Sequence, residues 1–285
     1  MCDEDINPWA LDSAVSRRAF GAGAGAAVVL TAAEASAPAG VTEKDVKVKT
    51  SDRQADAVVL YPAGKGPWPG VLIWTDIGGL RPVFREMGRR LAAQGYTVLV
   101  PNPFYRSATP AEYANLTFAT PEGRTTLFGY RGKMTDEGID NDAKAYLAFL
   151  DAQPQTNKKK MAGVQGYCMG GPLSFRTAGA VPTRIGAVAT FHGGGLVTPQ
   201  PSSPHLLVAK TKAAYLIAVA KNDDARAPND KETLKATFAE TKRPATVEVY
   251  GGDHGWTVPG SPVYNQAESE RAWAALSALY KKNLG

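Results

Sequence analysis

A cysteine lies at the centre of the glycine-rich stretch GYCMGG, residues 166 to 171. Residues 161 to 165 favour a short strand and residues 172 to 180 favour a helix, so we expect the thiol on a strand-to-helix turn. The first five residues of the stretch fit the G-x-S-x-G pattern of a strained turn that exposes a nucleophile, with Cys in place of Ser. The pattern indicates that Cys168 is a nucleophile, although a structural cysteine on a glycine-rich turn would look the same.

Three further reactive side chains follow predicted strands. Asp76 comes after VLIWT, Asp223 after AYLIAVA, and His254 after ATVEVYGGD. Because the carboxyl ends of parallel strands meet at one edge of a sheet, we expect these groups to lie close to Cys168. Their order along the chain, nucleophile then acid then histidine, is that of the α/β-hydrolases.

The residue types predict a division of roles in ester or thioester chemistry. The imidazole of His254 would take the thiol proton and later protonate a leaving alcohol. Asp223 would orient the ring, although the adjacent Asp224 in KNDDAR could also face it; the end of the preceding strand favours Asp223. The N–H of Met169, at the start of the predicted helix, could bind a developing oxyanion.

A second histidine lies in FHGGG, residues 191 to 195. This stretch looks like the oxyanion loop of lipases, but that loop precedes the nucleophile and this one follows it. We interpret it as a tight turn that closes a strand, with His192 as a candidate for the wall of a pocket.

The elements that would position these residues alternate along the chain. An antiparallel pair is expected within residues 41 to 60, and apolar runs predict later strands at 71–75, 96–101, 186–191, 214–220 and 245–250. Helices are expected from Pro82 to Gly95, from Asp136 to Ala152, and near 229–241 and 264–282. Strands that alternate with helices predict an α/β fold, a mostly parallel sheet covered by helices on both faces.

Composition limits the classes of function. A chain of 285 residues that is 44% hydrophobic can bury one large core, so we expect one catalytic domain, residues 40–285. The net charge of +5 comes from scattered residues, and the run Lys158-Lys159-Lys160 lacks interleaved aromatics, so no nucleic-acid partner is expected. No cluster has the ligand spacing of a metal site, so no metal or other cofactor is expected.

The first 39 residues have the pattern of a bacterial export signal. Arg17 and Arg18 precede a small-residue apolar stretch and an A-x-A-like end, which predicts a twin-arginine signal and a periplasmic protein. A membrane anchor is the alternative, but the apolar run is shorter than the roughly 20 residues a span needs. With Cys2 in this leader, the mature protein would hold Cys168 alone, a hazard in an oxidising compartment unless the thiol is sheltered or functional.

With these motifs the chain resembles the dienelactone hydrolase family. The resemblance rests on GYCMGG, DIGG, PNPFYR, AKND and GGDHGW, and it covers essentially all of the chain after the leader. It implies that Cys168 is the nucleophile, His254 the base and Asp223 the orienting acid. It also implies that the backbone N–H of Ile77 joins that of Met169 in an oxyanion hole.

The resemblance assigns a role to Asp76 and leaves the substrate open. The family typically has a glutamate in the loop after the second core strand, which keeps the resting thiol neutral, and Asp76 matches that position. An anionic neighbour disfavours a thiolate and slows its oxidation. Family members that open ring-cleavage lactones hold the substrate carboxylate with arginines, one of them shortly after the catalytic histidine. This chain has none there, so Arg106 and Arg131 are the remaining candidates.

The sequence therefore predicts a cysteine-dependent hydrolase of lactones or small carboxylic esters, of the carboxymethylenebutenolidase type, that acts through an acyl-thioenzyme. A general carboxylesterase of the same fold is one alternative. A non-catalytic exported protein that binds a ligand is another. The expected partner is a small ester or lactone, without stable membrane insertion, and we expect a monomer or a small homo-oligomer.

Overall fold

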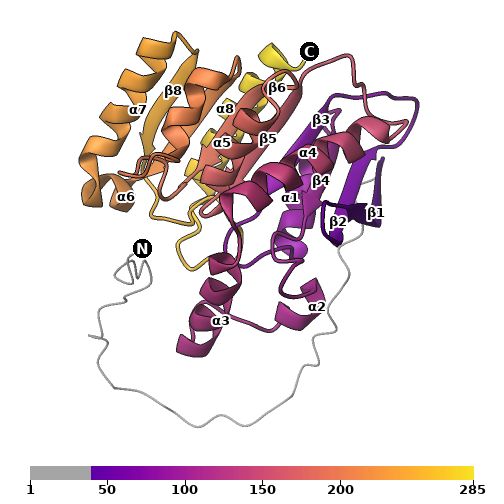
Figure 1. Cartoon of the computed structure of the whole chain (residues 1–285), viewed down its shortest axis with the longest axis horizontal. Coiled ribbons are helices and arrows are strands. Elements are labelled where there is room, and N and C mark those ends of the chain that lie inside the picture. Colours follow the sequence, from indigo (N-terminus) through magenta and orange to yellow (C-terminus); the bar gives the residue numbers. More distant parts are fainter. Residues whose placement is uncertain (1–39) are drawn as a thin grey trace. The chain divides into compact units, whose positions relative to one another are not determined.

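An eight-stranded sheet runs through the part of the chain that the computed structural model describes, residues 40–285 (Figure 1). Its strands are β1 (Val41–Lys49), β2 (Gln54–Pro62), β3 (Gly70–Trp74), β4 (Thr97–Pro101), β5 (Ala162–Tyr167), β6 (Ile185–Phe191), β7 (Ala214–Ala220) and β8 (Ala245–Tyr250). They lie in the order β1-β2-β4-β3-β5-β6-β7-β8. The β1–β2 and β2–β4 pairs are antiparallel and all later pairs are parallel, which confirms the predicted sheet.

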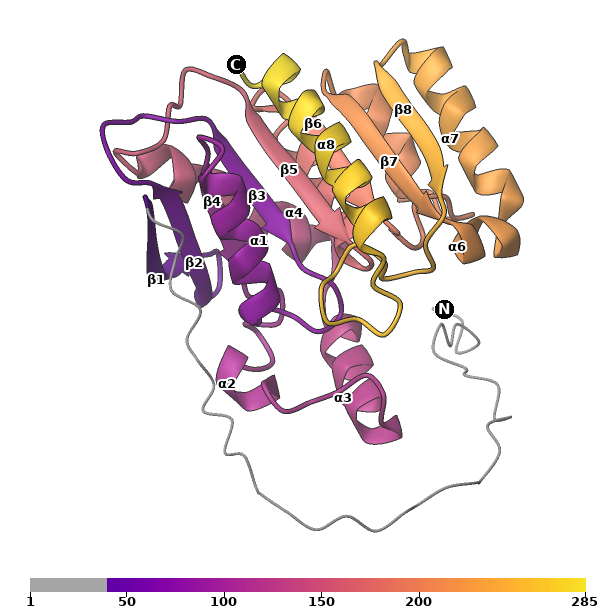
Figure 2. The ribbon, with the colours of Figure 1, turned by 180° about the vertical axis from the view of Figure 1, so that it is seen from behind.

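Helices cover both faces of the sheet. Three lie on the face seen in Figure 1: α4 (Asp136–Ala152), α5 (Gly170–Ala180) and α7 (Pro228–Thr241). Two lie on the face seen in Figure 2: α1 (Pro82–Ala92) and α8 (Gln266–Asn283). Each set buries its apolar residues in a separate core against the sheet. Since β3 and β4 are buried on both faces, their residues are nearly all apolar.

The helix α4 illustrates how the sequence determines an element. Thr135 precedes the first turn and accepts a hydrogen bond from the N–H of Gly138, which satisfies one of the free donors there. The apolar side chains recur every three or four residues and are buried: Ile139, Ala143, Tyr146, Leu147 and Leu150. The predicted bounds and inner face of this helix are therefore correct.

Several elements were not predicted from the sequence. They are α2 (Pro110–Tyr113), α3 (Pro121–Gly132), α6 (Lys221–Arg226) and the 3₁₀ helix η1 (Pro204–Lys210). The helix α5 begins at Gly170, two residues before the predicted start.

The predicted export signal, residues 1–39, lies outside the described residues. No helix of the described part has the length and apolarity that a membrane span requires.

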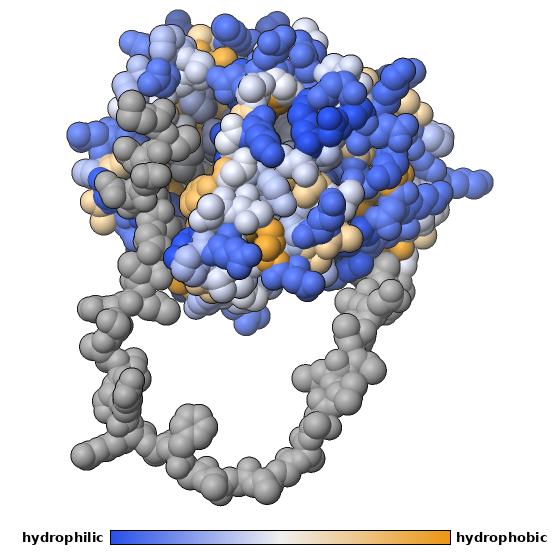
Figure 3. All heavy atoms as spheres, turned by 60° about the horizontal axis from the view of Figure 1, so that its bottom comes forward, coloured by the Kyte–Doolittle hydropathy of each residue, from blue (hydrophilic) through white to orange (hydrophobic). Residues whose placement is uncertain are grey.

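The helices α2 and α3 lie beyond the carboxyl ends of the parallel strands (Figures 1 and 2). We call residues 103–134, which contain them, the cap. Figure 3 looks onto this end of the molecule, where apolar side chains lie among hydrophilic ones. The reactive side chains that the sequence analysis singled out follow the same strand ends, so the cap and those groups belong to one end of the sheet.

Candidate active site

The backbone of the turn at Cys168 requires glycine at the neighbouring positions 166 and 170. Cys168 directly follows β5, with a φ of +52°, in the left-handed region that non-glycine residues rarely adopt. A Cβ at Gly166 would lie 1.9 Å from the carbonyl oxygen of Gly170, and one at Gly170 would lie 2.6 Å from that of Trp74. The two glycines therefore let the start of α5 pack directly against β5 and β3, and the strained turn presents the thiol.

The neighbouring strand supports the same turn. The N–H of Cys168 donates to the carbonyl of Phe191 at 3.1 Å, and its carbonyl accepts from the N–H of Gly171. A Cβ at Gly171 would lie 2.4 Å from the hydroxyl of Thr190 on β6. The position of Cys168 is thus determined by its backbone bonds to β6 and α5 and by the close packing of α5 on β6.

The imidazole of His254 is held between an acid and the thiol. Its Nδ1 lies 2.6 Å from Oδ2 of Asp223, and its backbone N–H donates to the side-chain oxygen of Asn222 at 2.8 Å. Burial opposes the charge on the ring, but Cys168 and Asp223, each by charge and by hydrogen bonding, raise the pKa of His254 to about 10. Asp223 therefore holds the ring of His254, and Cys168 is close enough to act on the charge of that ring, an arrangement suited to an acid, a base and a nucleophile.

The two adjacent aspartates face different ways. Asp223, on α6, contacts His254. Asp224 instead accepts two hydrogen bonds from Nζ of Lys231, each 2.7 Å long. The acid beside the imidazole is therefore Asp223, and Asp224 belongs to an ion pair between α6 and α7.

The backbone N–H groups of Ile77 and Met169 are available near the thiol. Both residues belong to an apolar cluster that also includes Cys168. Among residues 40–285, neither N–H donates any of the backbone hydrogen bonds formed outside helices and strands. These two N–H groups are therefore the candidate donors for an oxyanion.

Asp76 is paired with an arginine that the sequence analysis missed. Arg81 binds it through both ends of its guanidinium, one contact measuring 2.8 Å, and the N–H of Gly78 donates to the same carboxylate. Burial opposes the charge on Arg81, but Asp76 and, after it, Cys168 raise its pKa. The spacing of five residues in DIGGLR places Arg81 at the start of α1, a signal that could have identified it.

His192 lies against the base. It is fully buried, has a φ of +43°, and its ring centroid is 4.9 Å from that of His254. Its Nε2 bonds the hydroxyl of Thr257 at 2.9 Å, while Nδ1 has no partner within the described residues. Burial, together with the charge of His254, lowers the pKa of His192 well below its usual value, so this ring is a neutral wall beside the site.

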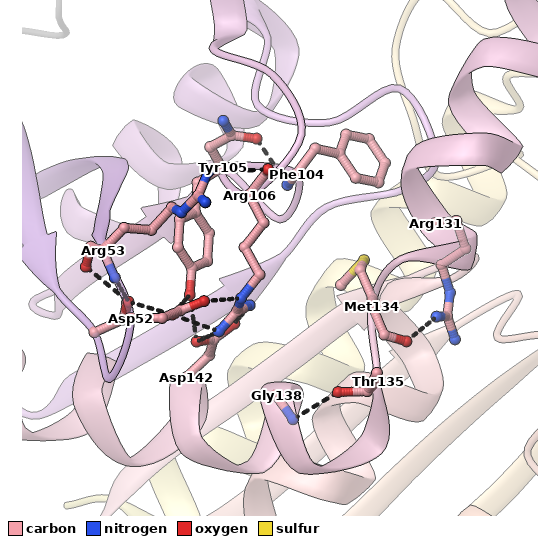
Figure 4. Close-up of polar contacts among 12 residues, drawn as sticks. Asp52, Arg53, Phe104, Tyr105, Arg106, Arg131, Met134, Thr135, Gly138 and Asp142 are labelled. Carbon is pink, nitrogen blue, oxygen red and sulfur yellow. Dashed lines mark hydrogen bonds and ion pairs between the residues drawn. The ribbon is translucent and has the colours of Figure 1, made fainter.

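Of the two candidate carboxylate binders, Arg106 is committed to other residues. Figure 4 shows its guanidinium bound to Asp52 and Asp142, with the Tyr105 hydroxyl on the same Asp142 carboxylate at 2.6 Å. Arg131 lies apart from this network, at the end of α3, and donates to the carbonyl of Met134 at 3.3 Å. Arg106 therefore anchors the base of the cap, whereas Arg131 forms no ion pair within residues 40–285.

No three His, Cys, Asp or Glu side chains within residues 40–285 form a group that could hold a metal ion. The reactive groups described above are the thiol, the imidazole, two carboxylates and backbone donors, which are suited to proton transfer and nucleophilic attack.

Known proteins share this fold and sequence pattern. The model of the dienelactone hydrolase family matches residues 55–284. A carboxymethylenebutenolidase of Rhodococcus opacus is 24% identical over 220 residues, which cover 75% of this chain and 81% of that protein. A solved structure, a dienelactone hydrolase-like promiscuous phosphotriesterase from metagenomic libraries, superposes with a TM-score of 0.71 at 23% identity, over 86% of this chain and all of the other. Another, m3DLH, has a TM-score of 0.70 at 21% identity, over 86% and 100% of the two chains.

Proposed function

Since the chain belongs to the dienelactone hydrolase family, whose activity is the hydrolysis of ester bonds, we propose that it cleaves lactones or small carboxylic esters through a Cys168 acyl-thioenzyme. In this proposal His254 is the base, Asp223 orients it, and the N–H groups of Ile77 and Met169 bind the oxyanion. The observations that support it most are the 2.6 Å contact of the His254 imidazole with Asp223 and the strained strand-to-helix turn that carries Cys168.

Acylation begins when His254 takes the thiol proton of Cys168. The sulfur attacks the ester carbonyl carbon, and the carbonyl oxygen becomes an oxyanion between the two N–H donors. As the tetrahedral intermediate collapses, the carbon–oxygen bond to the alcohol breaks and His254 gives its proton to that oxygen. The product alcohol leaves, or stays tethered if the substrate was a lactone.

Deacylation repeats the same steps with water. His254 takes a proton from water, and the oxygen attacks the thioester carbonyl. The carbon–sulfur bond then breaks, the carboxylic acid is released, and the proton returns from His254 to the sulfur of Cys168. Asp223 stabilises the imidazolium that forms in both halves of the cycle.

Asp76 modulates the thiol in this proposal, together with Arg81. The carboxylate alone would disfavour the thiolate, and the paired guanidinium offsets that effect. The bidentate contact between them supports treating the two as one unit, whose net field at Cys168 depends on whether they stay together.

The test is hydrolysis of p-nitrophenyl acetate by the wild type and by Cys168→Ala and His254→Ala. We expect each variant to lose about four or more orders of magnitude in kcat, since residues of such a unit are each required. Circular dichroism and thermal unfolding should match the wild type. Acid quenching during turnover should trap an acyl group on the Cys168 peptide by mass spectrometry. Wild-type turnover in Cys168→Ala would exclude this mechanism, and a folded wild type without esterase activity would favour a non-catalytic ligand-binding role.

Export is proposed from the paired arginines of the leader. Replacing Arg17 and Arg18 together with lysine keeps the charge but removes the pair, so the precursor should stay in the cytoplasm. The measurement is the periplasmic fraction of enzyme in a bacterial host. An undiminished periplasmic fraction would exclude this route.

A further inference from the structure

Apolar side chains of the cap form a cluster against which Cys168 packs. Buried cap and turn residues form one cluster: Phe104, Ala108, Tyr113, Leu127 and Met169. Half-buried residues pack against it, Cys168 itself among them: Ile77, Leu116, Phe118, Tyr130, Met134 and Cys168. A group bound beside the sulfur would therefore contact these apolar side chains.

The polar atoms of the buried cap residues are turned away from this surface. Phe104 lies at the centre, with ring centroids of Tyr113 and Tyr130 at 5.8 and 5.7 Å. The hydroxyl of Tyr113 donates to the side-chain oxygen of Asn102 at 2.9 Å and accepts from the N–H of Leu80 at 3.1 Å. The rings thus contribute edges and faces of carbon, the surface that an alkyl chain or aryl ring contacts well.

Two arginines in or beside the cap are engaged in ion pairs. Arg81 is bound by Asp76, and Arg106 by Asp52 and Asp142. Arg124 donates to the carbonyls of Phe118 and Ala119 at 3.2 and 3.3 Å. Arg124, Arg131 and the exposed Lys133 form no ion pair within residues 40–285, and the two arginines donate to backbone carbonyls. A substrate carboxylate at the cap would be desolvated against hydrocarbon without a prepared partner.

We propose that the cap selects neutral esters whose acyl group is an alkyl chain or an aryl ring, and that it disfavours substrates bearing a carboxylate. The proposal rests on the esterase function proposed above and assigns its substrate class. Half-buried residues such as Leu116 determine this preference, because they can contact the acyl chain while the buried ones support them.

The experiment compares kcat/KM for p-nitrophenyl acetate, butyrate and hexanoate with that for the mono-p-nitrophenyl ester of glutarate. Each buried methylene should raise kcat/KM by up to about fourfold. The glutarate ester has a chain of intermediate length but an ionised end, so its kcat/KM should fall at least about tenfold below that of hexanoate. A glutarate ester cleaved as fast as hexanoate, or faster, would overturn the proposal.

Two variants test the surface itself. Leu116→Lys puts a cation on the cap, so the hexanoate-to-glutarate ratio of kcat/KM should fall by about tenfold or more. Leu206→Lys, the same substitution at an exposed leucine of η1, outside the cap, should leave that ratio unchanged. Equal ratios in both variants would contradict a role for the cap surface.

Arg131→Gln identifies the alternative. If the wild type prefers the glutarate ester and Arg131→Gln loses that preference, the cap binds anions through Arg131 and the present proposal is wrong.

Cys168→Ala distinguishes a wrong substrate class from a wrong proposed function. Cleavage that depends on Cys168 with the opposite chain preference overturns only the substrate class, whereas the absence of any Cys168-dependent cleavage overturns the proposed function, and this proposal with it.

Discussion

The two sides of Cys168 are built differently. On the sheet side, strand-end turns deliver the thiol, the imidazole and the carboxylates, and glycines allow the backbones to touch. On the cap side, side chains of α2, α3 and their loops pack into an apolar cluster. The sheet side fixes individual atoms within hydrogen-bond distance, while the cap side provides a surface. The difference indicates that the chemistry and the choice of substrate reside in separable parts of the fold.

The largest expected effect tests the sheet side. Asp223→Asn should lower kcat by about four orders of magnitude, because an amide beside Nδ1 no longer stabilises the imidazolium and can favour the wrong tautomer. Asp224→Asn, one residue along, should change kcat little, since this carboxylate pairs with Lys231. Initial rates with p-nitrophenyl acetate decide between them. The reverse ranking would assign the orienting role to Asp224.

The sequence predicted the sheet side well because its geometry restricts residue type. At Gly166 and Gly170 any side chain would collide with backbone, so the turn can be recognised from five residues. The strands β3 and β7 could be predicted as apolar runs because they are almost entirely buried. Arg81 was missed because its partner, Asp76, was interpreted through the thiol alone.

The cap could not be predicted in the same way. The helix α2 has four residues, too few for any periodic pattern, and α3 buries only Gly123 and Leu127 of its twelve. Thr109-Pro110 and Thr120-Pro121 do mark the two helix starts, but the packing of these helices against the cluster depends on residues distant in the sequence. The role of Arg106 likewise depends on Asp52 and Asp142, which are distant in the sequence.

A smaller expected effect, on the free energy of unfolding, tests whether Arg106 anchors the cap. Arg106→Gln should lower the free energy of unfolding by about 3 kcal/mol at neutral pH, because it leaves the buried Asp142 carboxylate without its cation. Arg131→Gln, which loses only a bond to a carbonyl, should change it by less than about 0.5 kcal/mol. Urea unfolding gives both values. Equal losses in the two variants would mean that Arg106 is not the anchor.

The stability lost in Arg106→Gln should decrease as the pH falls. Burial raises the pKa of Asp142 in the folded protein, although Arg106 and Tyr105 oppose the shift. Without Arg106, less opposes the rise in the pKa of Asp142. The Asp142 carboxylate therefore binds a proton more readily in the folded variant than in the unfolded chain. Its stability deficit should therefore be full at neutral pH and shrink as the pH falls and Asp142 is protonated. A deficit independent of pH would point to lost packing rather than to the unpaired charge.

The smallest effect concerns the boundary between the two sides, where the pair of Asp76 and Arg81 lies near the sulfur. Asp76→Asn leaves an unbalanced cation, which favours the thiolate, so alkylation by iodoacetamide near neutral pH should speed up by about three- to tenfold. Arg81→Met leaves an unbalanced anion and should slow alkylation by a similar factor. The double variant removes both charges and should return close to the wild-type rate, since the two fields nearly cancel.

A matched control separates this field from a general effect of substitution on α1. Arg85→Met removes a guanidinium from the same helix, but that group pairs with Glu43 and Asp45 near β1, and its loss should not change the alkylation rate. If Asp76→Asn and Arg81→Met also leave the rate unchanged, the pair does not reach the sulfur, and burial and His254 alone would govern the thiol. If instead the two single variants change the rate in the same direction, the cause is a shift of the turn at Cys168, because a change of charge alone would have to act with opposite signs.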